Sequence, residues 1–304
     1  MNTNQVLLEF VILLAFIFIL YTIYKSYTKT SGQEGFQQKE RFILKINQDI
    51  YDDFYSEIYD TIILPNQTNT YIIEKVLDTV QPDKSHATIL DIGSKTGALV
   101  NYLNNKGYSA YGLEPSQYMV DYSISKYGDE LIIKNASVES AMTYDSFLFS
   151  HIFCLNKMIY ECENPDAVLK NCHYWLQNNG YFILHLIDFS KFNAIAPCGT
   201  NQLLPSIQQY GEKRVTKTFV DFSDFTYTSD FENLGGSRMI HKETFTDKIT
   251  QNIRQNENTL RIMDFDTVVG KCSRAGFLAK GYFTLENDDF IKDPFQRIYI
   301  FEKI

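Results

Sequence analysis

The sequence lacks the features of several common protein classes. It has five cysteines, and no two of them stand in a Cys-x-x-Cys spacing. Because a disulfide framework or a zinc site needs tighter clustering, we predict ordinary thiols in a reducing compartment and no metal site. It also has no basic run, and its net charge is −9. An acidic chain repels phosphate backbones, so nucleic acid is a poor candidate for a partner.

Only one apolar run, Val6–Ile23, is long enough to cross a membrane, and Glu9 is its single charge. As a helix it would span roughly 27 Å, about the thickness of the hydrocarbon core. A cleaved signal peptide is the rival interpretation, but the start MNTNQ has no Lys or Arg, and the run leads into bulky Tyr21 and Tyr24. We therefore predict an uncleaved transmembrane anchor in residues 1–29.

The flanks of this run predict its orientation. The basic residues near it, Lys25 and Lys29, both follow it, and the positive-inside tendency then places the rest of the chain in the cytosol. Glycans on the sequons at Asn66 and Asn135 would contradict this topology. Residues 30–48 begin polar and Gly-bearing, which predicts a tether before the folded domain.

From residue 49 to 304, helical and strand patterns alternate. Apolar strands are expected at Ala87–Ile92, Ser109–Glu114, Leu131–Ala136, Ser146–Phe153, Tyr181–Asp188, Phe277–Leu285 and Arg297–Glu302. Such alternation with short loops indicates an α/β domain with a mainly parallel sheet and helices on both faces. Residues 197–260 instead alternate polar and apolar side chains at period two, which predicts a small antiparallel insertion.

A Gly-bearing turn follows the first predicted strand, in the run Asp91–Gly97 (DIGSKTG). Gly93 and Gly97 let the backbone approach a ligand closely, and the next helix offers free N–H groups. The second strand ends at Glu114, whose carboxylate can accept both hydroxyls of a ribose. A nicotinamide fingerprint would need G-x-G-x-x-G, which fails at Lys95 and Ala98.

Asp91–Gly97 followed by Gly112–Met119 (GLEPSQYM) resembles the first two motifs of class I S-adenosylmethionine-dependent methyltransferases. The resemblance runs from about Ile50 to the carboxyl terminus and fits the small-molecule branch of the family. The chain is also similar to uncharacterised methyltransferase-like proteins of large DNA viruses. This resemblance implies a Rossmann-like, doubly wound, mainly parallel seven-stranded sheet and S-adenosylmethionine as the cofactor.

The resemblance also implies which residues bind that cofactor: Asp91, Gly93, Ser94, Gly97, Glu114, Pro115, Ser116, Asn135, Ala136, Ser150 and Tyr55. Two positions depart from the family pattern. Lys95 replaces the middle glycine of the loop and could crowd the methionine tail of the cofactor. Asn135 stands where a carboxylate usually binds the adenine amino group, and its amide oxygen can accept that hydrogen bond without the charge.

Methyl transfer needs an aligned nucleophile and often a base. His151, placed at the carboxyl end of the fourth strand, is the predicted catalytic base, although a structural role fits it equally well. His185 fits a core residue, and Asp188 fits either substrate orientation or a strand end. Tyr51, Tyr55 and Tyr59 share one helix face, which fits a lid over the cofactor or simple packing on the sheet.

The sequence therefore predicts a membrane-anchored enzyme that methylates a small molecule or a lipid headgroup at a membrane surface. Two alternatives stay open. The first is a catalytically silent, membrane-tethered binding protein, suggested by Lys95 and Asn135. The second is a protein methyltransferase. The acceptor, the membrane and the oligomeric state have no signal in the sequence.

Overall fold

The computed structural model describes residues 12–20, 38, 40–200 and 214–304. The chain divides into two units, Met1–Lys39 and Glu40–Ile304. In the amino-terminal unit, residues 12–20 form a helix whose apolar side chains are exposed. None of the helices within the described residues is both long and apolar enough to cross a membrane. The predicted span Val6–Ile23 lies partly outside those residues, as do most of residues 21–39.

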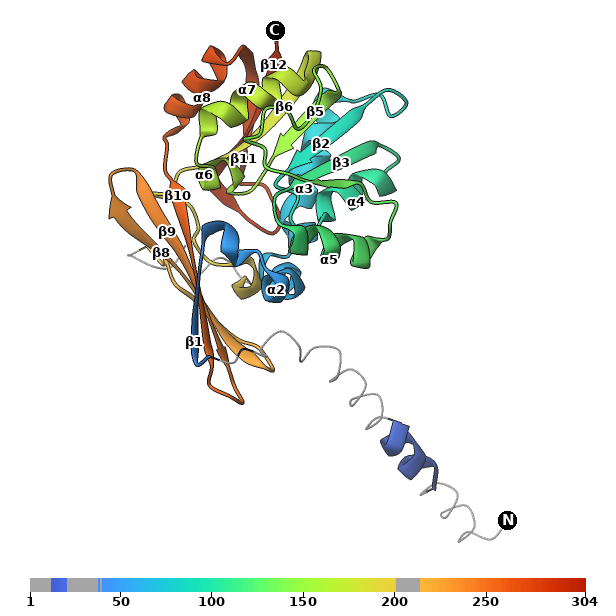
Figure 1. The fold of residues 1–304 in the computed structure, drawn as a ribbon, viewed down its shortest axis with the longest axis vertical. Coiled ribbons are helices and arrows are strands. Elements are labelled where there is room, and N and C mark those ends of the chain that lie inside the picture. Colours follow the sequence, from blue (N-terminus) through green and yellow to red (C-terminus); the bar gives the residue numbers. More distant parts are fainter. Residues whose placement is uncertain (1–11, 21–37, 39, 201–213) are drawn as a thin grey trace. The chain divides into compact units, whose positions relative to one another are not determined.

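The main sheet of the second unit has seven strands in the order β11-β12-β6-β5-β2-β3-β4 (Figure 1). Strands β2 to β6 run parallel, whereas β12 is antiparallel to both of its neighbours. The bounds are β2 Thr88–Ile92, β3 Ser109–Glu114, β4 Ile133–Asn135, β5 Phe149–Cys154, β6 Leu176–Ile187, β11 Phe277–Leu285 and β12 Asp293–Lys303. This mixed, mainly parallel seven-stranded sheet confirms the predicted α/β class.

Helices cover both faces of this sheet. One face packs against α3, α4 and α5, and the other packs against α6, α7 and α8. Their bounds are α3 Pro65–Val80, α4 Ala98–Asn105, α5 Gln117–Tyr127, α6 Met158–Glu161, α7 Pro165–Trp175 and α8 Phe265–Arg274. Side chains cap the amino ends of α5 and α7, since Ser116 accepts a hydrogen bond from the Met119 N–H and Asn164 accepts one from the Ala167 N–H.

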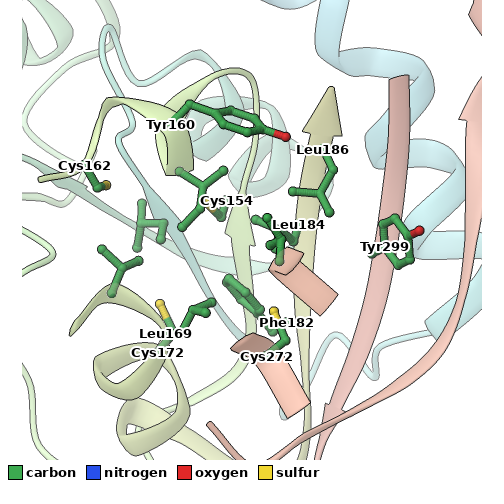
Figure 2. Packing of buried hydrophobic residues seen from close by; sticks show 14 of the residues in the cluster. Cys154, Tyr160, Cys162, Leu169, Cys172, Phe182, Leu184, Leu186, Cys272 and Tyr299 are labelled. Atoms are coloured by element: carbon green, nitrogen blue, oxygen red, sulfur yellow. The ribbon is translucent and has the colours of Figure 1, made fainter. Parts of the chain in front are cut away.

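The core beneath α6, α7 and α8 contains four of the five cysteines (Figure 2). Cys154, Cys162, Cys172 and Cys272 are buried among aromatic and aliphatic side chains such as Phe182. All five cysteines are free thiols, and burial raises the pKa of Cys162 and Cys272 to about 12. These thiols therefore act as small apolar core residues.

A second sheet of five strands has the order β1-β10-β9-β8-β7. Its strands are β1 Phe42–Ile46, β7 Thr218–Asp221, β8 Phe225–Gly235, β9 Arg238–Asp247 and β10 Ile253–Arg261. β7 to β10 form the predicted antiparallel insertion, with alternating burial along β9 and β10. Residues 201–213 of the insertion lie outside the described part of the chain.

Two sequence-based boundaries are wrong. Residues 42–46, predicted to belong to a tether, form β1 and pair in parallel with β10. The pairing of Phe42 with Ile253 is a long-range contact, which local composition does not signal. The strand expected at Tyr181–Asp188 begins earlier, since β6 starts at Leu176 and includes Asn179, which adopts a left-handed backbone with φ of 60°.

The segment after β1 joins the two sheets. It contains the short helix η1 (Asn47–Ile50) and α2 (Asp53–Ile63). Buried Arg254 of β10 forms an ion pair with Asp52 at 2.9 Å, donates to the Ile50 carbonyl at 3.1 Å and stacks on the ring of Phe54. These contacts hold the start of α2 against the inner face of the second sheet.

Candidate active site

In the turn after β2, every second residue from Gly93 to Gly97 has a positive φ. Gly93, Lys95 and Gly97 have φ values of 72°, 51° and 74°. Position 93 favours glycine for two reasons: its φ is positive, and a Cβ there would lie 2.7 Å from Cγ of Met158. Gly97 is similarly close-packed, since its Cβ would lie 2.8 Å from side-chain carbons of Ile133 and Leu131. The turn thus lies directly against neighbouring side chains.

Glu114 ends β3 beside this turn. Its two carboxylate oxygens accept hydrogen bonds from the backbone N–H groups of Lys95 at 2.9 Å and Ser116 at 3.0 Å. A carboxylate has about four lone-pair positions, so two remain for the hydroxyls of a ribose. Glu114 is 0% exposed in this structure. A ribose can therefore reach it only when the covering side chains move aside.

Asp91 is the buried acid of the same turn. Burial raises the pKa of its carboxyl to about 8; Ser94 and Lys95 oppose the shift, and Glu114 adds to it. The hydroxyl of Ser94 joins the two strands, since it donates to the Asp91 carbonyl at 2.8 Å and accepts from the Leu113 N–H at 3.0 Å. Asp91 and Ser94 therefore fix the shape of the turn.

A cavity of about 390 Å³, here called the β2–β3 cavity, opens beside this turn. Its lining includes Gly93, Leu113, Pro115 and the residues that follow β4, Ser137–Glu139. It lies at the carboxyl ends of the parallel strands, where open α/β sheets bind their ligands. A nucleotide that uses Glu114 would occupy this cavity.

A second cavity, of about 170 Å³, lies between the two sheets and α2 and is here called the inter-sheet cavity. Side chains of α2, of the β5–α6 connection and of the inner face of β8 to β10 line it. Gly93, Lys95, Met158, Glu161 and Asn258 line both cavities. These five residues form the partition at which a group could pass from one cavity to the other.

An ion pair occupies this partition. Nζ of Lys95 lies 3.4 Å from Oε2 of Glu161, and the same oxygen accepts the hydroxyl of Tyr51 at 3.0 Å. Burial acts to lower the pKa of Lys95, but Glu161 and Glu114 outweigh it and raise that pKa. Lys95 is therefore a cation in the closed partition.

The inter-sheet cavity also contains charges from the second sheet and the β5–α6 connection. Glu243 of β9 accepts the hydroxyls of Tyr55 at 2.7 Å and Tyr227 at 2.8 Å. Lys157 lies with its ammonium 5.3 Å from the ring centroid of Phe231. Burial and the neighbouring Lys95 lower the pKa of Lys157, whereas Glu161 and Glu243 oppose that shift.

The predicted cofactor residues fall into groups. Asp91, Gly93, Ser94, Gly97, Glu114, Pro115 and Ser116 lie together at the β2 and β3 ends. Asn135 supports their backbone, since its amide nitrogen donates to the carbonyls of Glu114 and Pro115 at 3.1 and 3.0 Å, and Ala136 N–H donates to the Glu114 carbonyl. Tyr55 lines the inter-sheet cavity and not the β2–β3 cavity.

His151 and Ser150 do not lie at the carboxyl edge, which corrects their predicted positions. β5 begins at Phe149 and continues to Cys154, so both residues are near its amino end. Ser150 exchanges hydrogen bonds with Thr88 at the start of β2, and its hydroxyl lies 2.8 Å from Nδ1 of His151. Neither lines the two cavities. The error is one of strand boundary, because the apolar run does not mark where β5 starts.

Several residues of the site have no clear signal in the sequence. Ser137–Glu139, Lys157, Met158 and Glu161 follow β4 and β5, where loops at the carboxyl edge carry function. Glu243 has a usable signal, since period-two alternation places it on the same strand face as buried Phe245. His185, predicted as a core residue, is buried but also lines the inter-sheet cavity.

Known proteins share parts of this arrangement. Residues 90–184 match the family described as Methyltransferase domain. A protein of Alkaliphilus oremlandii named an uncharacterized methyltransferase is 27% identical over 112 residues, which cover 34% of this chain and 52% of the relative. The alignment thus spans about half the length of that curated relative.

Solved structures extend the likeness to most of the chain. An S-adenosylmethionine-dependent methyltransferase from Clostridium acetobutylicum has a TM-score of 0.61 at 14% identity, covering 82% of this chain and 97% of its own. CalS10 from Micromonospora echinaspora, an amino pentose methyltransferase solved with S-adenosylmethionine bound, has a TM-score of 0.54 at 14% identity, covering 78% and 91%. The chain therefore shares the fold of these S-adenosylmethionine-dependent methyltransferases, and its residues 90–184 match the methyltransferase-domain family.

Proposed function

We propose that this protein transfers the methyl group of S-adenosylmethionine to a small molecule or a lipid headgroup. The observation that carries the proposal is the pair of cavities that meet at one partition. The β2–β3 cavity lies beside a Gly-bearing turn and the carboxylate of Glu114. The inter-sheet cavity is partly closed, and its mainly apolar lining includes the charged side chains of Lys157 and Glu243. The structural likeness to CalS10, an amino pentose methyltransferase, supports a small-molecule acceptor.

The residues present fit S-adenosylmethionine. Glu114 has lone pairs left for a ribose once the side chains that cover it move aside, and Gly93 lines the cavity next to it. Bound there, the cofactor would supply a methyl group on a cationic sulfur. The chain would hold the sugar at Glu114 and present the acceptor from the inter-sheet cavity through the partition. The inter-sheet cavity lies between the two sheets and α2. A ligand that displaced water from this path would strengthen the electrostatic interactions inside it.

The test uses labelled S-adenosylmethionine with lipid, metabolite and protein fractions of cells. Wild type is expected to label the metabolite or the lipid fraction. Asp91→Ala/Gly93→Arg is expected to abolish the label, because arginine at position 93 would collide with Met158. Gly107→Ala is the control, since Gly107 has a positive φ of 86° but no atom near its Cβ position. Label confined to polypeptides would contradict the proposed acceptor class.

A catalytically silent binding protein is the second candidate, and Lys95 favours it. Its ammonium stands at the partition, where it would repel a cationic sulfonium unless Glu161 keeps it paired. Isothermal titration of the full chain with S-adenosylmethionine, followed by the labelling assay, separates the two functions. Binding without label in any fraction would favour the silent protein, whereas binding with label would exclude it.

We also propose that Val6–Ile23 anchors the domain at a membrane, with the domain on the cytosolic side. The apolar sequence of this run, its single charge at Glu9 and the following Lys25 and Lys29 support the proposal. Membrane flotation of the full chain, compared with a variant lacking residues 1–29, tests it. Flotation of the truncated chain to the same extent would contradict an anchor in this segment.

A further inference from the structure

Glu243 is a buried carboxylate without a cationic partner in the described part of the chain. Its side chain points from the inner face of β9 into the inter-sheet cavity, and the residue is only 3% exposed. Its hydrogen-bond donors are the neutral hydroxyls of Tyr55 and Tyr227. Two neutral donors orient a carboxylate but do not cancel its charge, and an unpaired buried charge is costly. A cationic ligand would relieve that cost.

Lys157 has the complementary property. It lies in the connection between β5 and α6 and lines the same cavity. Within residues 40–200 and 214–304, no carboxylate oxygen lies within ion-pair distance of its ammonium, which has the ring of Phe231 as a neighbour. Burial lowers the pKa of Lys157, and the charges of Glu161 and Glu243 oppose that shift without direct contact. An anionic ligand group would give this ammonium a direct partner.

The other titratable groups of the cavity do not supply these partners. Lys95 and Glu161 are paired with each other at the partition. Burial lowers the pKa of His185 to about 4 and that of His241 well below its usual range, so both imidazoles are neutral near pH 7. Burial raises the pKa values of the lining tyrosines, which stay neutral: Tyr51, Tyr55, Tyr59 and Tyr227. One carboxylate and one ammonium therefore remain for a ligand.

We infer that the methyl acceptor is a small amine that also carries an anionic group, with its ammonium bound at Glu243 and its anionic group at Lys157. This inference rests on the proposed function. A free phosphorylated amine, an amino acid and the headgroup of an aminophospholipid share this chemistry. The cavity volume of about 170 Å³ is many times the roughly 10–15 Å³ that one water needs by the same measure. The aromatic walls at Tyr55 and Tyr227 also suit an ammonium group.

Methyl transfer to the amine begins with loss of a proton. The bound ammonium passes one proton to the Glu243 carboxylate and becomes a neutral amine. Its nitrogen lone pair then forms a bond to the methyl carbon as the carbon–sulfur bond breaks, and the electron pair of that bond goes to sulfur. The products are the methylated ammonium and S-adenosylhomocysteine, and Glu243 afterwards releases its proton to solvent.

The experiment identifies the labelled product and then tests the two charges. Wild-type chain is incubated with labelled S-adenosylmethionine and separate metabolite and lipid extracts, and the product is characterised by ion exchange and mass spectrometry. We expect a compound with both an amine and an anionic group; the extract that yields it distinguishes a free amine from a lipid headgroup. A labelled product without either group would overturn the inference while leaving methyl transfer established. Absence of label in every fraction would instead contradict the proposed function.

The variants Glu243→Gln and Lys157→Met test the assignment. Each is expected to raise KM for the identified acceptor by about tenfold or more, because it leaves one substrate charge unpaired in a buried site. The affinity for S-adenosylhomocysteine should change less than about twofold, which also shows that each variant is folded. The matched controls are Glu257→Gln and Lys242→Met. Glu257 and Lys242 form an ion pair at 3.6 Å on the outer face of the second sheet, opposite to Glu243. If either cavity variant kept the wild-type KM, that residue would not bind the acceptor.

A conservative variant keeps the test informative if Glu243→Gln fails to fold. Tyr227→Phe removes one hydrogen bond to Glu243 and retains the ring and the carboxylate. We expect it to raise KM for the acceptor by a smaller factor, about two- to tenfold. An unchanged KM for this variant together with a well-folded protein would argue against an ammonium site at Glu243.

Discussion

The ammonium of Lys95 lies 3.4 Å from the carboxylate of Glu161 and 3.4 Å from the ring centroid of Tyr51. The two charged side chains are each 12% exposed, so solvent screens this pair only weakly. Their position between two cavities explains how a lysine can replace the middle glycine of the turn. The Lys95 side chain lies in the partition, where it forms an ion pair with the carboxylate of Glu161 from α6.

Loss of one partner of this pair should destabilise the fold. Lys95→Met leaves Glu161 shielded and without its cation, so we expect the free energy of unfolding to fall by about 2–4 kcal/mol. Lys95→Met/Glu161→Gln should recover most of that loss, because both charges are removed together. Chemical denaturation measures the unfolding free energies of the single and the double variant. The control is Lys106→Met, which breaks a pair with Glu74 whose side chains are 36% and 41% exposed and should cost under about 1 kcal/mol.

A methyl group at Gly93 should weaken both the fold and the cofactor site. Gly93→Ala forces alanine into a φ of 72° and places its Cβ 2.7 Å from Met158 Cγ. We expect a loss of about 1–3 kcal/mol in unfolding free energy and at least about tenfold weaker binding of S-adenosylhomocysteine. Denaturation and isothermal titration measure these effects.

Gly107→Ala separates the two causes. Gly107 also has a positive φ, 86°, but its Cβ position is free of atoms within 4 Å. It should lose stability from the backbone alone and retain the cofactor affinity. Equal affinities in Gly93→Ala and wild type would show that the contact of Gly93 with Met158 does not shape the cofactor site.

Sequence patterns correctly predicted the parts of the fold that are determined by interactions between residues close together in the chain. The apolar run before Gly93 and the acid at Glu114 fix β2, β3 and the turn between them, because continuous burial, the glycine backbone and a helix N-cap act over a few residues. By contrast, β1 forms only because Phe42–Ile46 meets β10, about two hundred residues away. The inter-sheet cavity could not be predicted for the same reason, since Tyr55 and Glu243 meet only after the second sheet folds.

His151 was assigned to the wrong part of β5 because the boundaries of that strand were predicted incorrectly. A continuous apolar strand has no periodicity that marks its ends, so a boundary error of a few residues moves a side chain from one edge of a sheet to the other. His151 pairs with Ile89 and Tyr181, stacks on the Tyr181 ring and lies beside Ser150. These contacts give it a structural role far from the strand ends that carry the site.

His151→Gln should therefore retain methyl transfer. Burial lowers the pKa of His151 to about 4, so the imidazole is neutral near pH 7 and its replacement removes no charge. We expect kcat to stay within about threefold of wild type and the unfolding free energy to fall by about 1–2 kcal/mol, because a stacked and buried ring is lost. A steady-state assay with the identified acceptor measures kcat. A fall in kcat of a hundredfold or more in a fully folded variant would instead support His151 as the catalytic base.

Asp91 should make the ligand-free fold less stable as pH rises. Its pKa is about 8 in the folded chain and about 3.9 in an unfolded one. Between about pH 4 and pH 8 the unfolded chain ionises this group while the folded chain keeps its proton, so unfolding free energy falls by up to about 1.4 kcal/mol per pH unit. The contribution is constant below and above this window.

Asp91→Asn removes that dependence, so the unfolding free energy of the variant minus that of wild type should increase steadily from pH 5 to pH 8. Denaturation without cofactor at several pH values measures the difference. Asp83→Asn is the matched control, because hydrogen bonds from His86 and Ser85 lower the pKa of Asp83 to about 2 and any linkage of that group lies below the tested range. A difference for Asp91→Asn that stays flat across this range would mean that Asp91 is already ionised in the folded chain. Its charge would then be available, near Lys95, to attract the cationic part of the cofactor.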